Sequence, residues 1–378
     1  MADTATRGGG LEGLVAADTA LSEVDGEAGR LTLCGYALED LAPRAEFEET
    51  VYLFLNGRLP NRAELAGLRR ELAARRTLPT GAQALLRDAA RNSVPVMDAL
   101  RMAAPTLSIG RNESAAQEAL TAIAAFPTIV GSYWRLKQGL DTMTPRPDLG
   151  HAAHYLHQLY GGEPAPERTR AVETYLNTVC DHGFNASTFT ARVIISTRSD
   201  VISAVTGAVG ALKGPLHGGA PGPALDMVFE IGTPERAEPY IREKLARGER
   251  LMGFGHRIYR TRDPRADVLA AASEHVYHDP SSHEFYEFAR KVEQTALRLL
   301  EELKPGRRLQ TNVEFYTALL LHGAGLETEL FTPTFAVGRV LGWTAHCMEQ
   351  IKEDRLIRPQ SRYVGPRGRK FVAIEERG

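Results

Sequence analysis

The sequence predicts a mainly α-helical protein with one short β-hairpin near its N-terminus. After Leu38 most of the chain carries apolar residues at helical spacing, in segments interrupted by Gly and Pro. Two short alternating runs within 19–36 flank Asp25-Gly26 and Gly29, a pattern typical of a hairpin. The length of 378 residues exceeds what one core usually supports, so we expect two unequal domains.

The helical segments can be placed in order along the chain. The first run includes Phe47 and ends at Asn56-Gly57, and the second starts after Pro60-Asn61. The segment 204–214, AVTGAVGALKG, is apolar or small on nearly all sides, which indicates a helix buried between other helices or at a subunit contact. Further helices are predicted over 119–136, 170–180, 201–212, 234–245, 284–303 and 331–352.

Composition and charge exclude several classes of protein. A hydrophobic content of 43% with 24% charged residues is ordinary for a globular protein and excludes a disordered chain. The 45 Lys and Arg against 47 Asp and Glu give a net charge of −2, without the basic surface of a nucleic-acid-binding protein. No apolar run approaches the roughly 20 residues of a membrane helix. The start MADTATRGGG lacks the apolar core of a secretory signal, so we expect a cytoplasmic protein.

The three cysteines, Cys34, Cys180 and Cys347, lie far apart and form no CxxC pair. This spacing argues against a disulfide framework and against a structural zinc site. We expect these side chains to be buried as small apolar groups.

Two segments place a histidine among glycines. His217 lies in GPLHGGAPGP (214–223), and His256 lies in MGFGHRIYRTRDPRA (252–266). Glycine doublets allow the backbone to approach a ligand closely, although an exposed loop would explain the first segment equally well. The second segment adds Arg257, Arg260, Arg262 and Arg265, which indicate either a solvated face or a binding site for a small carboxylate or phosphate.

Two further segments carry candidate catalytic groups. DHGFNASTFTARV (181–193) contains His182 and Ser187 on a polar turn, where helix capping by Asp181, Asn185 or Ser187 is the alternative interpretation. Glu314, in TNVEFY (311–316), either points to solvent or occupies a partly dry site where its basicity rises. Together with the two histidines and the arginines, these groups suit proton abstraction next to a carbonyl.

The other histidines give weaker indications of a functional site. His151, His154 and His157 follow the spacing i, i+3, i+6, but no carboxylate or cysteine cluster accompanies them, so a surface or interface helix is favoured over a zinc site. His322 and His346 lie in apolar helices, as is typical of core histidines.

Taken in order, these motifs resemble the citrate synthase family, and within it the shorter bacterial form that includes the 2-methylcitrate synthases. The resemblance implies an almost wholly helical homodimer. Its large domain would comprise 1–218 and 330–378, and a small domain, 219–329, would close over the active site. The segments that carry the resemblance are 10–36, 94–103, 181–189, 214–220, 252–266, 311–316, 331–350 and 355–366.

The resemblance also implies an activity. Members of the family bind oxaloacetate and then acetyl-CoA, condense them to citryl-CoA, and hydrolyse the thioester without a metal or redox cofactor. His217 is similar to the histidine that binds the thioester carbonyl, and Ser187 to the serine that orients it. His256 resembles the histidine that polarises the ketone of oxaloacetate. Glu314 occupies the place of the base that removes the methyl proton.

The remaining assignments concern binding. His182, Arg265 and Arg339 resemble the groups that bind oxaloacetate, and Arg358 resembles the arginine that the partner subunit contributes. The expected contacts to CoA are Arg260, Met252, Gly253, Phe254 and Gly255.

Two positions depart from the family pattern. The usual base is an aspartate, and Glu314 is one methylene longer, a difference that matters because a shift of about 1 Å can reduce a rate roughly a hundredfold. Pro221 replaces the asparagine that usually follows the glycines after His217, so a backbone donor is lost. A 2-methylcitrate synthase that uses propionyl-CoA is a second hypothesis, because one methylene in an apolar pocket changes binding by only about 1–3 kcal/mol. A catalytically silent relative that binds CoA or a dicarboxylate is a third.

Overall fold

The computed structural model describes residues 11, 13–218, 221–255, 259 and 261–377. Over these residues it confirms a mainly helical fold with a small N-terminal sheet. The α-helices are α1 (Leu38–Leu41), α2 (Phe47–Asn56), α3 (Arg62–Ala74), α4 (Thr80–Arg91), α5 (Val96–Ala103), α6 (Ala115–Lys137), α7 (His151–Tyr160), α8 (Pro166–Val179), α9 (Ala186–Ile195), α10 (Val201–Leu212), α11 (Pro221–Ile231), α12 (Pro234–Ala246), α13 (Pro264–Val276), α14 (Pro280–Leu303), α15 (Val313–Gly323) and α16 (Phe331–Glu353).

The N-terminal sheet has three antiparallel strands in the order β1-β2-β3. The predicted hairpin is confirmed, because β1 (Ser22–Asp25) pairs with β2 (Arg30–Leu33). The Asp25 carboxylate accepts a hydrogen bond from the Ala28 amide at 2.8 Å and closes the turn. The third strand, β3 (Tyr36–Ala37), was not predicted, because two residues are too few to show alternation.

The six predicted helical ranges all fall on helices, with ends that differ by a few residues. The helix α6 starts four residues before the predicted range, because Ser114 and Gln117 form a capping box there. The helix α14 also starts four residues early, with Pro280 in its first turn, where proline is favoured. No described helix is long and apolar enough to cross a membrane.

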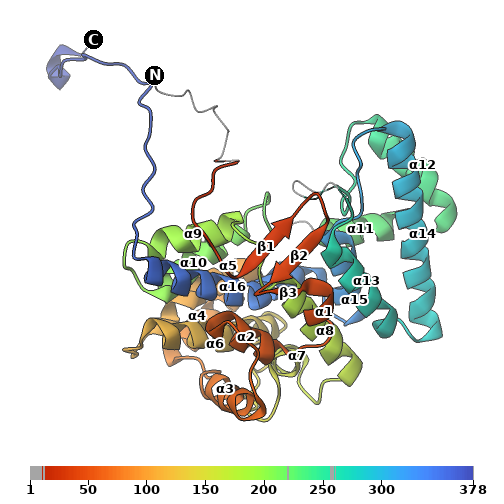
Figure 1. The fold of residues 1–378 in the computed structure, drawn as a ribbon, viewed down its shortest axis with the longest axis horizontal. Helices are drawn as coiled ribbons and strands as arrows, with labels where there is room; N and C mark the ends of the chain where they lie inside the picture. The colour runs from red at the N-terminus through yellow and green to blue at the C-terminus, as the bar shows by residue number, and fades with distance from the viewer. Residues whose placement is uncertain (1–10, 12, 219–220, 256–258, 260, 378) are drawn as a thin grey trace.

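The helix α16 crosses the middle of the molecule, behind the sheet in the view of Figure 1, and is the centre of the core. It packs against α6, α8, α9 and α10, and most of its residues up to Cys347 are buried. Two glycines allow its close approach to α8. A Cβ added at Gly338 would lie 2.9 Å from Cγ2 of Val179, and one at Gly342 would overlap the carbonyl oxygen of Cys180.

The helices α11 to α15 follow one another and lie together at one end of the molecule (Figure 1). Within this group α12 packs against α14, and α15 packs against both α11 and α13. The helices α13 and α15 also contact α8, which connects the group to the core.

The expectation for the histidines of α7 is wrong. His151, His154 and His157 are buried rather than displayed on a surface or interface helix, with exposed fractions of 0%, 0% and 5%. The cause is the packing of α7 on α6: a Cβ at Gly131 would lie 2.7 Å from the backbone carbon of Gln158, so only glycine permits the contact. Burial lowers the pKa of His151 to about 3 and that of His154 to about 2.

The three cysteines are free, and the expectation that all of them are buried is confirmed for two of the three. Cys180 and Cys347 are buried, whereas Cys34 is half-buried beside the hairpin. Within the described ranges, no group of three or more His, Cys, Asp or Glu side chains is arranged to hold a metal ion.

The contact at Gly342 predicts a large effect of adding one methyl group. We expect Gly342→Ala to lower the free energy of unfolding by about 1–3 kcal/mol, because the new Cβ meets backbone that cannot yield without moving α8. Gly67→Ala, in α3, is the control: its Cβ would meet nothing within 4 Å, so the variant should gain about 0.5–1 kcal/mol. Urea unfolding measures both, and equal stability of Gly342→Ala and the parent would contradict the packing argument.

Candidate active site

The turn between α8 and α9 brings two candidate residues to the centre of the molecule. Asn185 caps α9, since its Oδ1 accepts hydrogen bonds from the amides of Ser187 at 3.2 Å and Thr188 at 3.1 Å. The capping interpretation of this segment is therefore correct for Asn185. It does not replace the functional one, because the Ser187 hydroxyl lies 2.8 Å from Nε2 of His217.

The surroundings of His217 bear on which ring nitrogen carries the proton. The backbone amide of Ser187 lies 3.3 Å from Nε2 and donates toward it. In the tautomer that fits this contact, the proton of the neutral ring is on Nδ1, which can act as a donor toward a ligand. Burial, and secondly the charge of Arg339, lower the pKa of His217 to about 4, so the ring is neutral near pH 7.

A tryptophan in α16 supports the same serine. Nε1 of Trp343 donates a hydrogen bond to the Ser187 hydroxyl at 3.0 Å. Trp343 is four residues after Arg339 and therefore on the same helix face. That spacing was the signal by which the sequence could have identified it.

His182 contacts the second cluster of candidate residues. It is 8% exposed, and its Nε2 lies 3.1 Å from the hydroxyl of Tyr259. The guanidinium of Arg265 lies 5.9 Å from the centre of the Tyr259 ring. Tyr259 thus stands between two of the predicted substrate-binding groups, a role that its sequence context did not reveal.

Asp263 joins the segment that carries Arg265 to the start of α15. Its carboxylate accepts hydrogen bonds from Nε of Arg265 at 3.0 Å and from Nη2 at 2.8 Å. It also accepts one from the amide of Val313 at 3.2 Å. Arg265 is 5% exposed and Asp263 is 1% exposed, so the ion pair is buried. The N-cap position of Asp263, just before Pro264, was the available sequence signal.

Glu314 lies in the first turn of α15, where Asn312 is the N-cap. Oδ1 of Asn312 accepts a hydrogen bond from the Glu314 amide at 2.9 Å. Burial raises the pKa of Glu314, Arg265 opposes that rise, and Asp263 adds to it. The sequence left two possibilities for the Glu314 carboxylate, exposure to solvent and a partly dry site. The structure shows the partly dry site.

The glycine-rich segment before His256 is tied to the residues before Glu314. Nδ2 of Asn312 donates to the Gly255 carbonyl at 2.9 Å, and the Asn312 amide donates to the Gly253 carbonyl at 3.0 Å. Gly253 has φ +84°, and a Cβ there would lie 2.9 Å from Cβ of Phe315. This position therefore requires glycine for both its conformation and its packing.

Arg339 carries a positive charge that is almost completely buried. It is 1% exposed, and within the described chain it makes one hydrogen bond, from Nε to the Val179 carbonyl at 2.6 Å. Burial lowers its pKa to about 10; Asp181 opposes this effect and Arg265 adds to it. The positive charges of Arg265 and Arg339 therefore repel each other. The terminal NH2 groups of Arg339 can donate hydrogen bonds to an anion.

The structure thus brings together six of the predicted residues: His182, Ser187, His217, Arg265, Glu314 and Arg339. His256 and Arg260 lie outside the described residues. Arg358 is exposed in the tail that follows α16 and runs away from the helices (Figure 1).

Of the four arginines of 252–266, Arg262 and Arg265 are among the described residues. Arg262 and Arg265, the two that are described, do not form a solvated face, because both are paired with carboxylates. Arg262 pairs with Asp267 and, at 3.2 Å, with Glu293. Pro221, the other departure noted in the sequence, is the first residue of α11, where a backbone donor has no helical partner anyway.

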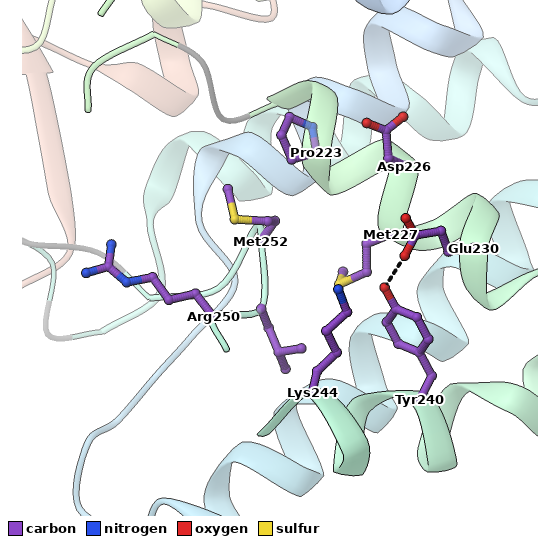
Figure 2. Close-up of a pocket in the computed structure, with 9 residues that line it drawn as sticks. Pro223, Asp226, Met227, Glu230, Tyr240, Lys244, Arg250 and Met252 are labelled. Atoms are coloured by element: carbon purple, nitrogen blue, oxygen red, sulfur yellow. Dashed lines mark hydrogen bonds between the residues drawn. The ribbon is translucent and has the colours of Figure 1, made fainter. Parts of the chain in front are cut away.

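A cavity of about 190 Å³ adjoins the predicted CoA-contact segment, since Met252 is part of its wall (Figure 2). Lys244 and Arg250 provide two positive charges, and Glu230 accepts a hydrogen bond from Tyr240. The lining residues are Pro223, Asp226, Met227, Glu230, Tyr240, Lys244, Arg250, Leu251 and Met252.

The chain is similar to known proteins over nearly its whole length. The profile of the family described as "Citrate synthase, C-terminal domain" matches residues 10–360. Citrate synthase 2 of Bacillus subtilis is 41% identical over 381 residues, which cover 99% of this chain and 100% of that protein. The 2-methylcitrate synthase of Shewanella oneidensis is 39% identical, with 98% of each chain covered.

Solved structures agree with these relatives. The citrate synthase of the thermophilic archaeon Thermoplasma acidophilum superposes with a TM-score of 0.87 and 32% sequence identity. The superposition covers 97% of this chain and 98% of that one. That structure is a ternary complex with carboxymethyl-coenzyme A and oxaloacetate.

The low pKa of His217 predicts how stability depends on pH. The unfolded chain protonates this histidine near pH 6.5, whereas the folded chain does so near pH 4, so acidification between these values favours unfolding. We expect the free energy of unfolding to fall between pH 7 and pH 5, and to fall less in His217→Gln. The exposed His278 provides the control variant, His278→Gln. Urea titrations at both pH values measure the effect, and an identical loss in His217→Gln and the parent would contradict it.

Proposed function

This chain belongs to the citrate synthase family, and we propose that it condenses acetyl-CoA with oxaloacetate and hydrolyses citryl-CoA to citrate and CoA. It is an acyltransferase. We propose that it acts in the cytoplasm as an enzyme of the tricarboxylic acid cycle. A citrate synthase and a 2-methylcitrate synthase both match nearly the whole chain, at 41% and 39% identity. The thiol-release assay described below therefore decides whether the substrate is acetyl-CoA or propionyl-CoA.

The observation that carries the proposal is the pair of buried arginines. Arg339 and Arg265 are almost fully buried, and the charge of Arg265 helps to lower the pKa of Arg339. A dicarboxylate offsets such a cost, because each carboxylate can accept two hydrogen bonds from a guanidinium fork. His182, close to Arg265 through Tyr259, is proposed to bind the same ligand. The ternary complex of the archaeal relative, which holds oxaloacetate, supports this assignment.

The proton transfer is proposed to use Glu314 and His217. The methyl protons of a thioester are only weakly acidic, so a carboxylate base needs a group that stabilises the oxygen of the developing enolate. His217 is suited to this role because its Nδ1 carries the proton while Ser187 holds Nε2. Glu314 is suited to the role of base because burial raises its affinity for a proton. His256 is proposed to polarise the ketone of oxaloacetate.

The cavity beside Met252 is proposed to bind the nucleotide part of CoA. Its two basic side chains, Lys244 and Arg250, can contact phosphates, and Met252 offers an apolar surface to a base (Figure 2). The segment Met252–Gly255 and Arg260 are proposed to complete this contact, as the family resemblance implies.

Closure and dimer formation complete the proposal. Residues 219–329 are proposed to form a small domain that closes over the substrates and excludes water until the carbon–carbon bond has formed. A second copy of the chain is proposed to contribute its Arg358 to the site. The exposure of Arg358 in the extended tail supports this, since such a side chain is accessible to a partner (Figure 1).

Release of the CoA thiol tests the function directly. We expect purified protein to release thiol from acetyl-CoA only when oxaloacetate is present, as measured in a colorimetric assay. The ratio of kcat/KM for acetyl-CoA and propionyl-CoA identifies the physiological substrate, and one methylene should change it by about 10- to 200-fold. Binding of oxaloacetate without thiol release from either thioester would instead support the catalytically silent relative.

The raised pKa of Glu314 predicts how the reaction rate decreases at acidic pH. The base must be ionised to accept a proton, so kcat/KM should fall as the pH drops through a value above the ordinary 4.5 of a glutamate. Glu314→Gln should lower kcat at least about a hundredfold and keep oxaloacetate binding. Glu301→Gln, at an exposed position of α14, is the matched control. Unchanged turnover in Glu314→Gln would remove this residue from the mechanism.

A further inference from the structure

A chain of buried polar side chains, separate from the residues proposed to touch substrates, leads from α16 and α9 to the turn that carries His182. Its members are Asp181, His346 and Arg192, with exposed fractions of 0%, 0% and 1%. Nε2 of His346 lies 3.2 Å from Oδ1 of Asp181 and 3.3 Å from Oδ2. Nδ1 of His346 lies 3.2 Å from Nη1 of Arg192. We name these three residues the Asp181 triad.

The geometry of the Asp181 triad determines the tautomer of His346. The guanidinium of Arg192 can only donate, so Nδ1 of His346 must accept and carries no proton. The single ring proton is therefore on Nε2, where it is donated to Asp181. Each group thus has one defined role, and the hydrogen bonds run in one direction from Arg192 to Asp181.

Arg192 is itself held firmly. Its Nε donates to Oε1 of Gln350 at 2.8 Å, and its Nη1 and Nη2 contact Glu349 at 3.0 Å and Glu353 at 3.3 Å. Its guanidinium lies 4.8 Å from the centre of the Phe184 ring. A buried charge without such partners would cost several kcal/mol, so these contacts are needed for Arg192 to remain inside the fold.

The other end of the triad immobilises the backbone on both sides of His182. Oδ2 of Asp181 accepts a hydrogen bond from the Ser22 hydroxyl at 2.5 Å. The same hydroxyl accepts one from the Gly183 amide at 2.9 Å. The residues before and after His182 are therefore both fixed, while His182 itself projects from the turn and contacts Tyr259.

We propose that the Asp181 triad is a positioning device that holds His182 in the orientation that binds oxaloacetate. This inference rests on the proposed function, in which His182 binds that substrate. Apolar residues of similar volume would stabilise the core as well as three buried polar groups do, and often better. What the polar chain adds is direction, because each hydrogen bond from Arg192 through His346 to Oδ2 of Asp181 fixes the orientation of the next group, while Oδ1 of Asp181 has no hydrogen-bond partner among the described residues.

A pair of substitutions at His346 separates positioning from general stability. The amide of His346→Gln can donate to Asp181 and accept from Arg192, whereas His346→Leu can do neither. Thr344→Val is the control: it is buried on the same helix, and among the described residues its hydroxyl bonds to the Leu341 carbonyl of that helix alone. Ser22→Ala, on the half-buried edge of the sheet, tests the same backbone contact without altering the core.

The readouts are the Kd of oxaloacetate from calorimetry, the KM and kcat of thiol release, and the Tm. We expect His346→Leu to raise the Kd and KM for oxaloacetate at least about tenfold, and Ser22→Ala to raise them about threefold. His346→Gln should stay within about threefold of the parent, and Thr344→Val should lower the Tm without changing the Kd.

Several results would overturn the inference. Unchanged oxaloacetate binding in folded His346→Leu would do so, and so would equal losses in the Gln and Leu variants. If His346→Leu does not fold, an unchanged Kd in Ser22→Ala has the same consequence. A parent protein that fails to bind oxaloacetate would contradict the proposed function, and the inference with it.

Discussion

The close contact between α16 and the end of α8 is the constraint on which the candidate site depends. Gly338 and Gly342 bring the two backbones together more closely than any side chain allows. From the same helix Arg339 bonds to the Val179 carbonyl, and Trp343 bonds to Ser187. One helix therefore places a guanidinium and an indole beside the turn that carries His182 and Ser187, two residues of the candidate site. Because the contact involves backbone, it is rigid in a way that side-chain packing alone is not.

The second constraint is the burial of charge. The centre of the molecule contains Arg192, Arg265 and Arg339, all 5% exposed or less. Arg192 and Arg265 are neutralised by carboxylates of the chain itself, whereas Arg339 is only partly compensated through space by Asp181. A poorly compensated buried cation lowers the stability of the fold, and such a group is a candidate binding site for an anionic ligand.

A third feature of the structure joins two segments that lie far apart in the sequence. The glycine-rich segment before His256 pairs with the residues before Glu314 through an isolated β-bridge between Phe254 and Thr311. Asn312 is at the centre of this joint, because it both caps α15 and bonds to Gly255. Asp263 adds a second link, from Arg265 to the same end of α15. The proposed base is thus placed by polar contacts to two separate stretches of backbone.

The sequence by itself determined the fold class, the hairpin, the existence of the main helices and the family, because these follow from local periodicity, turn residues and ordered motifs. It also identified six residues that the structure brings together. Only the tertiary structure decided that the histidines of α7 are buried, that Arg265 is paired with Asp263, and that Tyr259, Trp343 and Asp263 contact residues of the candidate site. Burial, pairing and tautomer depend on which distant segments pack together, and the spacing of residues along one segment carries no information about its partners.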